Sequence, residues 1–209
     1  MIGGSMSETP TFLSEPPATD EMRRLYDEDR AQDGYVWNVT RLWCWRPDTY
    51  AAFGALRAQL MGSSSLGDRD WAVLVTATAS ALGDSYCSLA WGQKLAKLSD
   101  DETAAEVIGG VEQPDGLSER EATLADWARR LVRDPNSTTP TDVERLRATG
   151  VGEREIFEAT AFVALRLAFS TVNDALGAGP DQQLADAAPS PVRDAVSYGR
   201  PARTEPSHT

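Results

Sequence analysis

The sequence predicts an all-α protein, and three observations support this fold class. Apolar residues recur at helical spacing in most segments between the glycines and prolines. Short polar residues that cap helices stand in front of several of these segments. No series of alternating polar and apolar residues marks a sheet, and the one run that would suit a buried strand, residues 73–76, is followed by alanine-rich sequence that favours a helix.

The first half of the chain is divided into helices by residues that end or begin them. Gly34 ends a charged first helix, Pro47 opens the third one, and Gly83 breaks a strongly apolar helix. Asp84 stands where it can cap the next helix, because Asp accepts hydrogen bonds from the free N–H groups of a first turn. The helices expected here cover residues 20–32, 36–45, 47–61, 68–82 and 85–98.

The second half follows the same logic. Asp100 begins a short helix, Ser118 opens the next, Thr141 caps a third, and a long last helix ends at Gly177. The expected helices cover residues 100–108, 118–133, 141–149 and 153–176. In two helices, apolar spacing predicts a buried face: Tyr50, Phe53, Leu56 and Leu60 in one, and Ile156, Thr160, Val163, Leu167 and Thr171 in the other.

The length of 209 residues suits a single domain with tails. Residues 1–18 and 188–209 are rich in proline or small polar residues and show no repeating apolar face, so we expect flexible tails there. The helical domain is expected over residues 19–187. No apolar run approaches the roughly 18 residues of a membrane span.

The composition excludes several classes of function. With 20 basic and 32 acidic residues the net charge is −12, which disfavours binding to nucleic acid or to an anionic membrane. The only histidine is His208, so no internal histidine can serve as a base or metal ligand. Two cysteines, Cys44 and Cys87, are too few for a four-cysteine zinc site, and a reduced, cytoplasmic protein without cofactor or metal is expected.

Acidic runs do not change that expectation. Residues 27–29 and 100–102 are consecutive carboxylates, and consecutive helical residues point in different directions, so they do not converge on one ion. Glu153, Glu155 and Glu158 surround a helix start, where negative charge interacts favourably with the helix dipole.

Residues 82–91 carry the most chemical information. Cys87 is placed in the first turn of a helix, where the dipole favours the thiolate. Asp84 lies three residues earlier on the same face, and its negative charge opposes a second anion. These effects are similar in size, so a reactive thiol and a small buried core cysteine both remain open.

The same segment resembles the alkylhydroperoxidase D and carboxymuconolactone decarboxylase superfamily, closest to its peroxidase-related branch. The resemblance rests on the Tyr86-Cys87 pair and on several weaker blocks in the same order. It extends over about residues 20–182 and implies the alkylhydroperoxidase D-like helical fold and a homo-oligomer. The other blocks are residues 34–38, 46–47, 131–135, 143–150 and 174–177.

The resemblance also implies four catalytic positions, of which this chain keeps one. Active peroxidases of the family carry a glutamate, a Cys-x-x-Cys pair and a histidine four residues later. Cys87 matches the second cysteine, whereas the glutamate falls on Ala72, the first cysteine on Asp84 and the histidine on Trp91. Cys44 can act as a resolving thiol only where the fold brings it to Cys87, since a disulfide needs Cα atoms within about 7 Å.

Two functions follow as alternatives. The first is a residual single-cysteine peroxidase of the peroxiredoxin type, an antioxidant oxidoreductase or thiol sensor that acts on peroxides and uses an external thiol as reductant. The second is a non-redox oligomeric protein that binds a small apolar ligand in an aromatic pocket, for which Trp43, Trp45 and Trp91 are candidates.

Arg166 interrupts an apolar stretch of the long last helix. A buried arginine needs an anionic partner, in the chain, in a subunit or in a ligand. A structural salt bridge is the expected solution.

Overall fold

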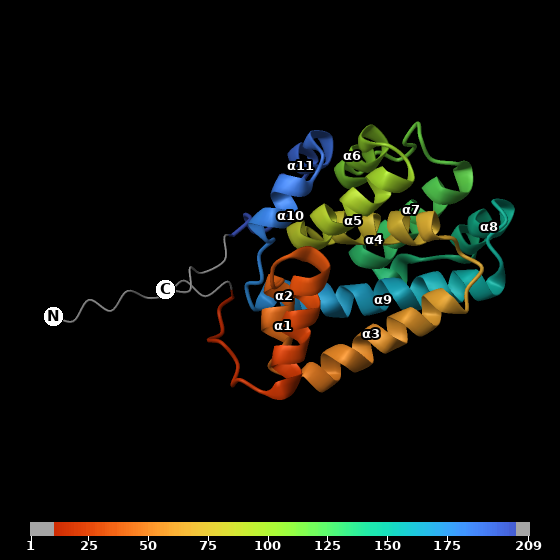
Figure 1. The fold of residues 1–209 in the computed structure, drawn as a ribbon. Helices are drawn as coiled ribbons and strands as arrows, with labels where there is room; N and C mark the ends of the chain where they lie inside the picture. The colour runs from red at the N-terminus through yellow and green to blue at the C-terminus, as the bar shows by residue number, and fades with distance from the viewer. Residues whose placement is uncertain (1–10, 204–209) are drawn as a thin grey trace.

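The computed structural model describes residues 11–203, and its regular elements are helices, as predicted (Figure 1). Within this range no strand forms, and a single isolated bridge joins Asp181 and Arg203. The elements are α1 (Asp20–Asp33), α2 (Asn38–Trp43), α3 (Pro47–Gly62), α4 (Asp68–Leu82), α5 (Ser85–Leu98), α6 (Asp101–Gly109), α7 (Glu119–Arg133), the 3₁₀ turn η1 (Pro135–Ser137), α8 (Pro140–Ala148), α9 (Glu153–Ala175), α10 (Gln182–Ala187) and α11 (Ser190–Ala195).

Helix α4 is the centre of the core. Every residue from Trp71 to Ala79 is buried, which requires neighbours on all sides of the helix. Those neighbours are α5, α6, α7 and α9. Figure 1 shows α9 running below α4 and α3 lying along the outer side of α9. The apolar run at residues 73–76 is therefore a core helix, as expected, because an apolar segment buried all round needs no polar face.

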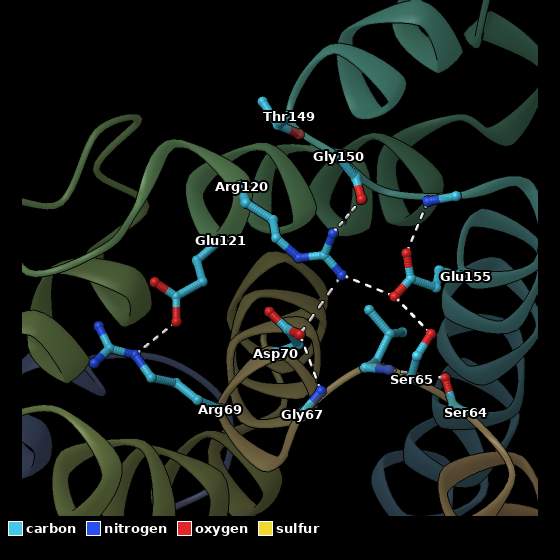
Figure 2. Close-up of polar contacts among 12 residues, drawn as sticks. Ser64, Ser65, Gly67, Arg69, Asp70, Arg120, Glu121, Thr149, Gly150 and Glu155 are labelled. Carbon is cyan, nitrogen blue, oxygen red and sulfur yellow. Dashed lines mark hydrogen bonds and ion pairs between the residues drawn. The ribbon is translucent and has the colours of Figure 1, made fainter.

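Arg120 holds the starts of α4 and α9 together from the side of α7 (Figure 2). Its guanidinium donates to the carbonyl of Gly150 at 2.7 Å and pairs with Glu155 at 3.0 Å and Asp70 at 3.8 Å. Both carboxylates also accept a backbone N–H at the start of their own helix. Glu155 therefore caps its helix, as its position predicted, and also joins α7 to α9.

Most of the predicted helix limits are confirmed, because glycines and capping side chains are local signals. Gly83 ends α4 with φ of 83°, and Ser118 forms a capping box with Glu121 at the start of α7. The prediction for α8 was wrong in its cap. Thr139 caps this helix and forms a box with Asp142, so the cap lies two residues before the expected Thr141 and the helix begins at Pro140.

The predicted buried faces of two helices are partly wrong. Helix α3 has no buried residue, and Leu56 on its outer side is 45 % exposed. On α9, Thr171 is exposed and the buried stripe runs instead through Phe162, Arg166 and Phe169. Helix α3 packs mainly on α9 and α2, which leaves its outer side in solvent, whereas α9 is also covered by α4 and α7.

Residues 188–203 do not form the loose tail that their composition predicted. Val192 of α11 is fully buried, and α11 packs against α6 and α5. Farther along, Ser85 Oγ donates to the carbonyl of Arg200 at 2.8 Å, and Tyr198 donates to Ser88 Oγ at 2.9 Å. Residues 198–200 therefore form a strap over the start of α5. Apolar periodicity does not reveal this strap, because its contacts are polar and join residues that are distant in sequence.

The predicted N-terminal tail, residues 1–18, is only partly covered by the structure. In the described part, the Phe12 amide donates to the carbonyl of Leu176 at 2.8 Å. Residues 1–10 and 204–209, with His208 among them, lie outside the described range. None of the helices within residues 11–203 has the length and apolar character needed to cross a membrane.

Candidate active site

The junction between α4 and α5 places a cysteine in the first turn of a helix. Gly83 adopts the left-handed conformation that ends α4, and Asp84 follows directly as the N-cap of α5. The Asp84 side chain accepts the backbone N–H of Cys87 at 2.9 Å. This local geometry is the one predicted, and it directs the thiol toward α9.

Cys87 is 3 % exposed and contacts two polar side chains of α9. Arg166 Nη2 lies 2.7 Å from Cys87 Sγ, and Ser170 Oγ donates to the same sulfur at 3.8 Å. Arg166 and Ser170 are four residues apart, so one face of α9 presents both of them to the thiol. The sulfur therefore has two hydrogen-bond donors, one of them a cation.

Burial and charge act in opposite directions on this thiol. Burial raises the pKa of Cys87 to about 12, the Arg166 guanidinium lowers it, and Asp84 raises it through its charge and as a hydrogen-bond acceptor. The net effect is a thiol that is protonated at neutral pH but lies beside a group able to stabilise its anion. The sequence left open whether the helix dipole or the Asp84 charge dominates the pKa of Cys87. In the structure the largest effect on that pKa is burial, which raises it.

A pocket of about 510 Å³ opens onto Cys87. Its walls come from α1, α2, α3, α5 and α9 and combine aromatic rings, Trp91 among them, with polar and charged side chains. The lining residues are Asp29, Gln32, Asp33, Trp37, Val39, Thr40, Tyr50, Arg57, Tyr86, Cys87, Ala90, Trp91, Arg166 and Phe169.

Two arginines contribute the positive charge of this pocket. The guanidinium carbons of Arg57 and Arg166 lie 5.5 Å and 5.0 Å from the ring centre of Phe169. In residues 11–203 no carboxylate lies within 4 Å of either guanidinium, so the expected salt bridge of Arg166 is absent from this part of the chain. Burial, and then the charge of Arg166, lower the pKa of Arg57. An anion in the pocket would offset the repulsion between the two guanidinium groups.

Comparisons with known proteins place this geometry in a known architecture. Neither the protein-family models nor the curated proteins match the sequence. Solved structures do match over most of the chain. A peroxidase-related protein from Silicibacter sp. TM1040 superposes with a TM-score of 0.76 at 23 % identity, covering 87 % of this chain and 97 % of that one. The chain has the alkylhydroperoxidase D-like fold.

Two further neighbours support the same assignment of fold. An alkylhydroperoxidase AhpD core protein from Ralstonia eutropha JMP134 has a TM-score of 0.74 at 23 % identity and covers 83 % of this chain and 94 % of that one. The debrominase Bmp8 has a TM-score of 0.69 at 15 % identity and covers 92 % and 100 %. A variant of Bmp8 in which alanine replaces a cysteine, in complex with 2,3,4-tribromopyrrole, also matches.

On the alkylhydroperoxidase D-like fold, the four positions implied by the resemblance do not all meet. Asp84 and Cys87 lie at the start of α5 and Trp91 one turn farther along it, and Cys87 and Trp91 share the pocket. Ala72 is fully buried in the middle of α4 and does not line this pocket. No acid–base group comes from that position, so the charged partners of the thiol are Asp84 and Arg166.

Cys44 lies in a separate apolar cluster from Cys87. It packs with Met22, Tyr26 and Val36, whereas Cys87 belongs to the main core. Both thiols are free. Burial raises the pKa of Cys44 to about 11. A resolving role for Cys44 receives no support from this arrangement.

The acidic runs are distributed among separate partners. Asp27 pairs with Arg30 and Glu28 with Arg24, while Asp29 accepts the backbone N–H of Trp37. In residues 11–203 no group of three His, Cys, Asp or Glu side chains is arranged to hold a metal ion.

Three site residues were not predicted from the sequence: Arg57, Phe169 and Ser170. A signal existed for Ser170, because it lies one helical turn after Arg166. Arg57 stands between Leu56 and Ala58, much as Arg166 stands between two leucines, and the same argument could have been applied to it.

Among the tryptophans considered for the pocket, only Trp91 lines it. Trp43 stacks on Phe169 at 5.1 Å and donates to Asn173, which makes it a core residue. Trp45 is exposed.

Proposed function

We propose that this chain is a single-cysteine thiol peroxidase with the alkylhydroperoxidase D-like fold, which reduces a small organic hydroperoxide at Cys87 and uses an external thiol as reductant. The observation that carries the proposal is the 2.7 Å contact between Arg166 Nη2 and Cys87 Sγ at the wall of a pocket. A cysteine buried only for packing does not need a cation at its sulfur, whereas a thiolate nucleophile does.

Asp84 is the group that can take the thiol proton. Its Oδ1 accepts the Cys87 amide, and its Oδ2 is buried without a hydrogen-bond partner among the described residues. The carboxylate lies close enough to the thiol for its charge to raise the pKa of Cys87, and the free Oδ2 gives the proton a destination near the sulfur. Arg166 and the N-terminal end of α5 then stabilise the negative charge on sulfur.

The oxidation step can be written with every atom assigned. The Cys87 thiolate attacks the terminal peroxide oxygen, the O–O bond breaks, and Cys87 becomes a sulfenic acid. The leaving alkoxide takes the proton held by Asp84 and departs as an alcohol. The sulfur is oxidised by two electrons and the peroxide is reduced by two. We expect turnover to be slow compared with peroxidases that have two cysteines, because burial keeps the thiol protonated.

The pocket favours an aromatic or acidic hydroperoxide over hydrogen peroxide. Trp37, Tyr50 and Trp91 supply ring surfaces. Two arginines beside Phe169 supply positive charge, and Asp29 and Asp33 lie in the same lining. The Bmp8 variant that binds 2,3,4-tribromopyrrole is an example of a protein of this fold that holds a planar ring. That likeness supports an aromatic substrate for this chain.

The test is the consumption of cumene hydroperoxide, with dithiothreitol as reductant, by wild-type protein and by Cys87→Ser. Cys44→Ser is the matched control, because it removes the other buried thiol. Loss of turnover in Cys87→Ser with turnover kept in Cys44→Ser supports the proposal. Equal turnover in wild type and Cys87→Ser, or none in wild type, overturns it.

A second candidate is a non-redox protein that binds an aromatic anion. The observation in its favour is the pair Arg57 and Arg166, which share one pocket without a carboxylate partner in the described chain. This function predicts binding of benzoate, detected by tryptophan fluorescence, with equal affinity in wild type and Cys87→Ser and no consumption of peroxide by either.

A further inference from the structure

A second cavity, of about 680 Å³, lies directly beside the Cys87 pocket. The two share four lining residues: Gln32, Asp33, Trp37 and Ala90. A molecule in the second cavity therefore lies next to whatever occupies the first, because these four residues border both. The arrangement suits a reaction in which two molecules act on Cys87 in turn.

The second cavity concentrates positive charge in an acidic protein. Lys94 and Lys97 are the only lysines among 209 residues, and both line it. They stand three residues apart, on one face of α5. In residues 11–203 no carboxylate lies within 4 Å of either ammonium group. In a chain with a net charge of −12, two unpaired lysines in one cavity indicate an anionic ligand.

The positive charge continues toward the thiol. The Lys94 ammonium lies 4.8 Å from the centre of the Trp91 ring, and the Arg166 guanidinium carbon lies 5.8 Å from the same ring. Trp91 thus connects the lysine cavity to the cation at Cys87 Sγ. A ligand held by the lysines would reach toward the sulfur across this tryptophan.

The rest of the lining suits a short peptide. Gln32, Gln93 and Gln183 present amides that can bond to peptide groups, and Gln93 uses its Nε2 on the carbonyl of Leu184, which leaves its oxygen available. Asp33 is the one carboxylate in this lining and can pair with an ammonium group. Two cations, one anion and several amides complement a small zwitterionic peptide.

We infer that this cavity binds the reductant: a peptide thiol of low molecular weight that carries two carboxylates, as glutathione does. This inference rests on the proposed function, since Cys44 lies in another cluster and an external thiol must regenerate Cys87. The thiol attacks the sulfenic acid of Cys87, which forms a mixed disulfide and releases water. A second thiol then attacks this disulfide, which returns Cys87 as a thiol and releases the symmetric disulfide.

The experiment separates binding from turnover. S-methylglutathione carries both carboxylates and cannot react, so its binding to Cys87→Ser is measured by tryptophan fluorescence and calorimetry. Binding that weakens about tenfold or more in the Lys94→Gln/Lys97→Gln double variant supports the inference, as expected for loss of charged hydrogen bonds. Arg133→Gln is the matched control, because it removes an exposed positive charge on α7.

The possible failures are distinct. No binding of S-methylglutathione, or equal binding in the double lysine variant, overturns the inference even where cumene hydroperoxide is consumed with dithiothreitol. Lysine-dependent binding without any peroxide turnover overturns the proposed function and leaves a peptide-binding cavity. In the active protein, glutathione should outperform the uncharged thiol 2-mercaptoethanol, and the double variant should remove that advantage.

Discussion

Arg166 and Cys87 are 79 positions apart in the chain, and the fold brings Nη2 of one to 2.7 Å from Sγ of the other. The arginine comes from the middle of α9 and the cysteine from the first turn of α5. A cation at this distance favours the thiolate, while burial opposes it. The reactivity of Cys87 therefore depends on a residue outside the segment that resembles a peroxidase motif.

Replacement of Arg166 by methionine should make Cys87 less reactive. Loss of the guanidinium raises the pKa of the thiol further, so alkylation by iodoacetamide at pH 9 should slow by about 10- to 100-fold, from the usual energy of a hydrogen bond to a charged group. Arg166→Lys should restore part of the rate. Arg129→Met, which removes a buried arginine of α7, is the control for general loosening. An unchanged rate in Arg166→Met would show that the contact has no effect on the sulfur.

Replacement of Asp84 by asparagine should separate its two effects on Cys87. Asn caps a helix as well as Asp, so α5 should be retained. Removal of the negative charge lowers the pKa of the thiol, and alkylation should become faster. Loss of the proton carrier should slow peroxide consumption by about 100-fold, the usual size of acid–base catalysis. If peroxide consumption increases together with alkylation, Asp84 acts by charge alone.

Stability should fall as the pH rises from about 4 to about 7. Burial raises the pKa of Asp174 from 3.8 to about 7, with the Asp84 charge as a further cause, and burial raises the pKa of Asp181 from its usual range to about 6. Because both folded-state values lie above the unfolded ones, these groups favour the folded state at low pH, and that contribution is lost as each ionises. Thermal unfolding of Asp174→Asn should show a smaller decrease in Tm over this range than wild type. Asp20→Asn, at an exposed carboxylate, should follow the wild-type profile.

Two helical glycines should respond to alanine with opposite signs. A Cβ at Gly92 would lie 2.8 Å from Ile108 Cδ1 and 2.9 Å from Val192 Cγ1, so overpacking should outweigh the helix preference of alanine and destabilise the protein by about 1–2 kcal/mol. A Cβ at Gly54 meets nothing within 4 Å, and Gly54→Ala should stabilise by about 0.5–1 kcal/mol. Urea unfolding measures both. Stabilisation by Gly92→Ala would mean that α6 and α11 pack less closely on α5 than the structure shows.

The helices could be predicted because residues close together in sequence determine where each helix begins and ends. Gly83 with Asp84, and Ser118 with Glu121, act within four residues of each other, and a sequence shows such pairs directly. Even the wrong cap of α8 had a local signal, since Thr139 and Asp142 have the spacing of a capping box.

The site was predictable only in part, because half of it comes from distant segments. Asp84, Cys87 and Trp91 are neighbours in sequence, so a single short segment was enough to identify them. Arg166 was singled out as a buried charge, but its partner proved to be a sulfur rather than a carboxylate. Arg57 reaches the pocket from α3, and no spacing rule connects it with α5.

The strap formed by residues 198–200 has a consequence for biosynthesis. Ser85 and Ser88, on either side of the cysteine, bond to Arg200 and Tyr198, residues that are translated 115 and 110 positions later. A nascent chain emerges N-terminus first, so α5 leaves the ribosome long before its strap exists. Arg166 and Phe169, which line the Cys87 pocket, also emerge after α5, so the thiol stands in an unfinished pocket until α9 has been made.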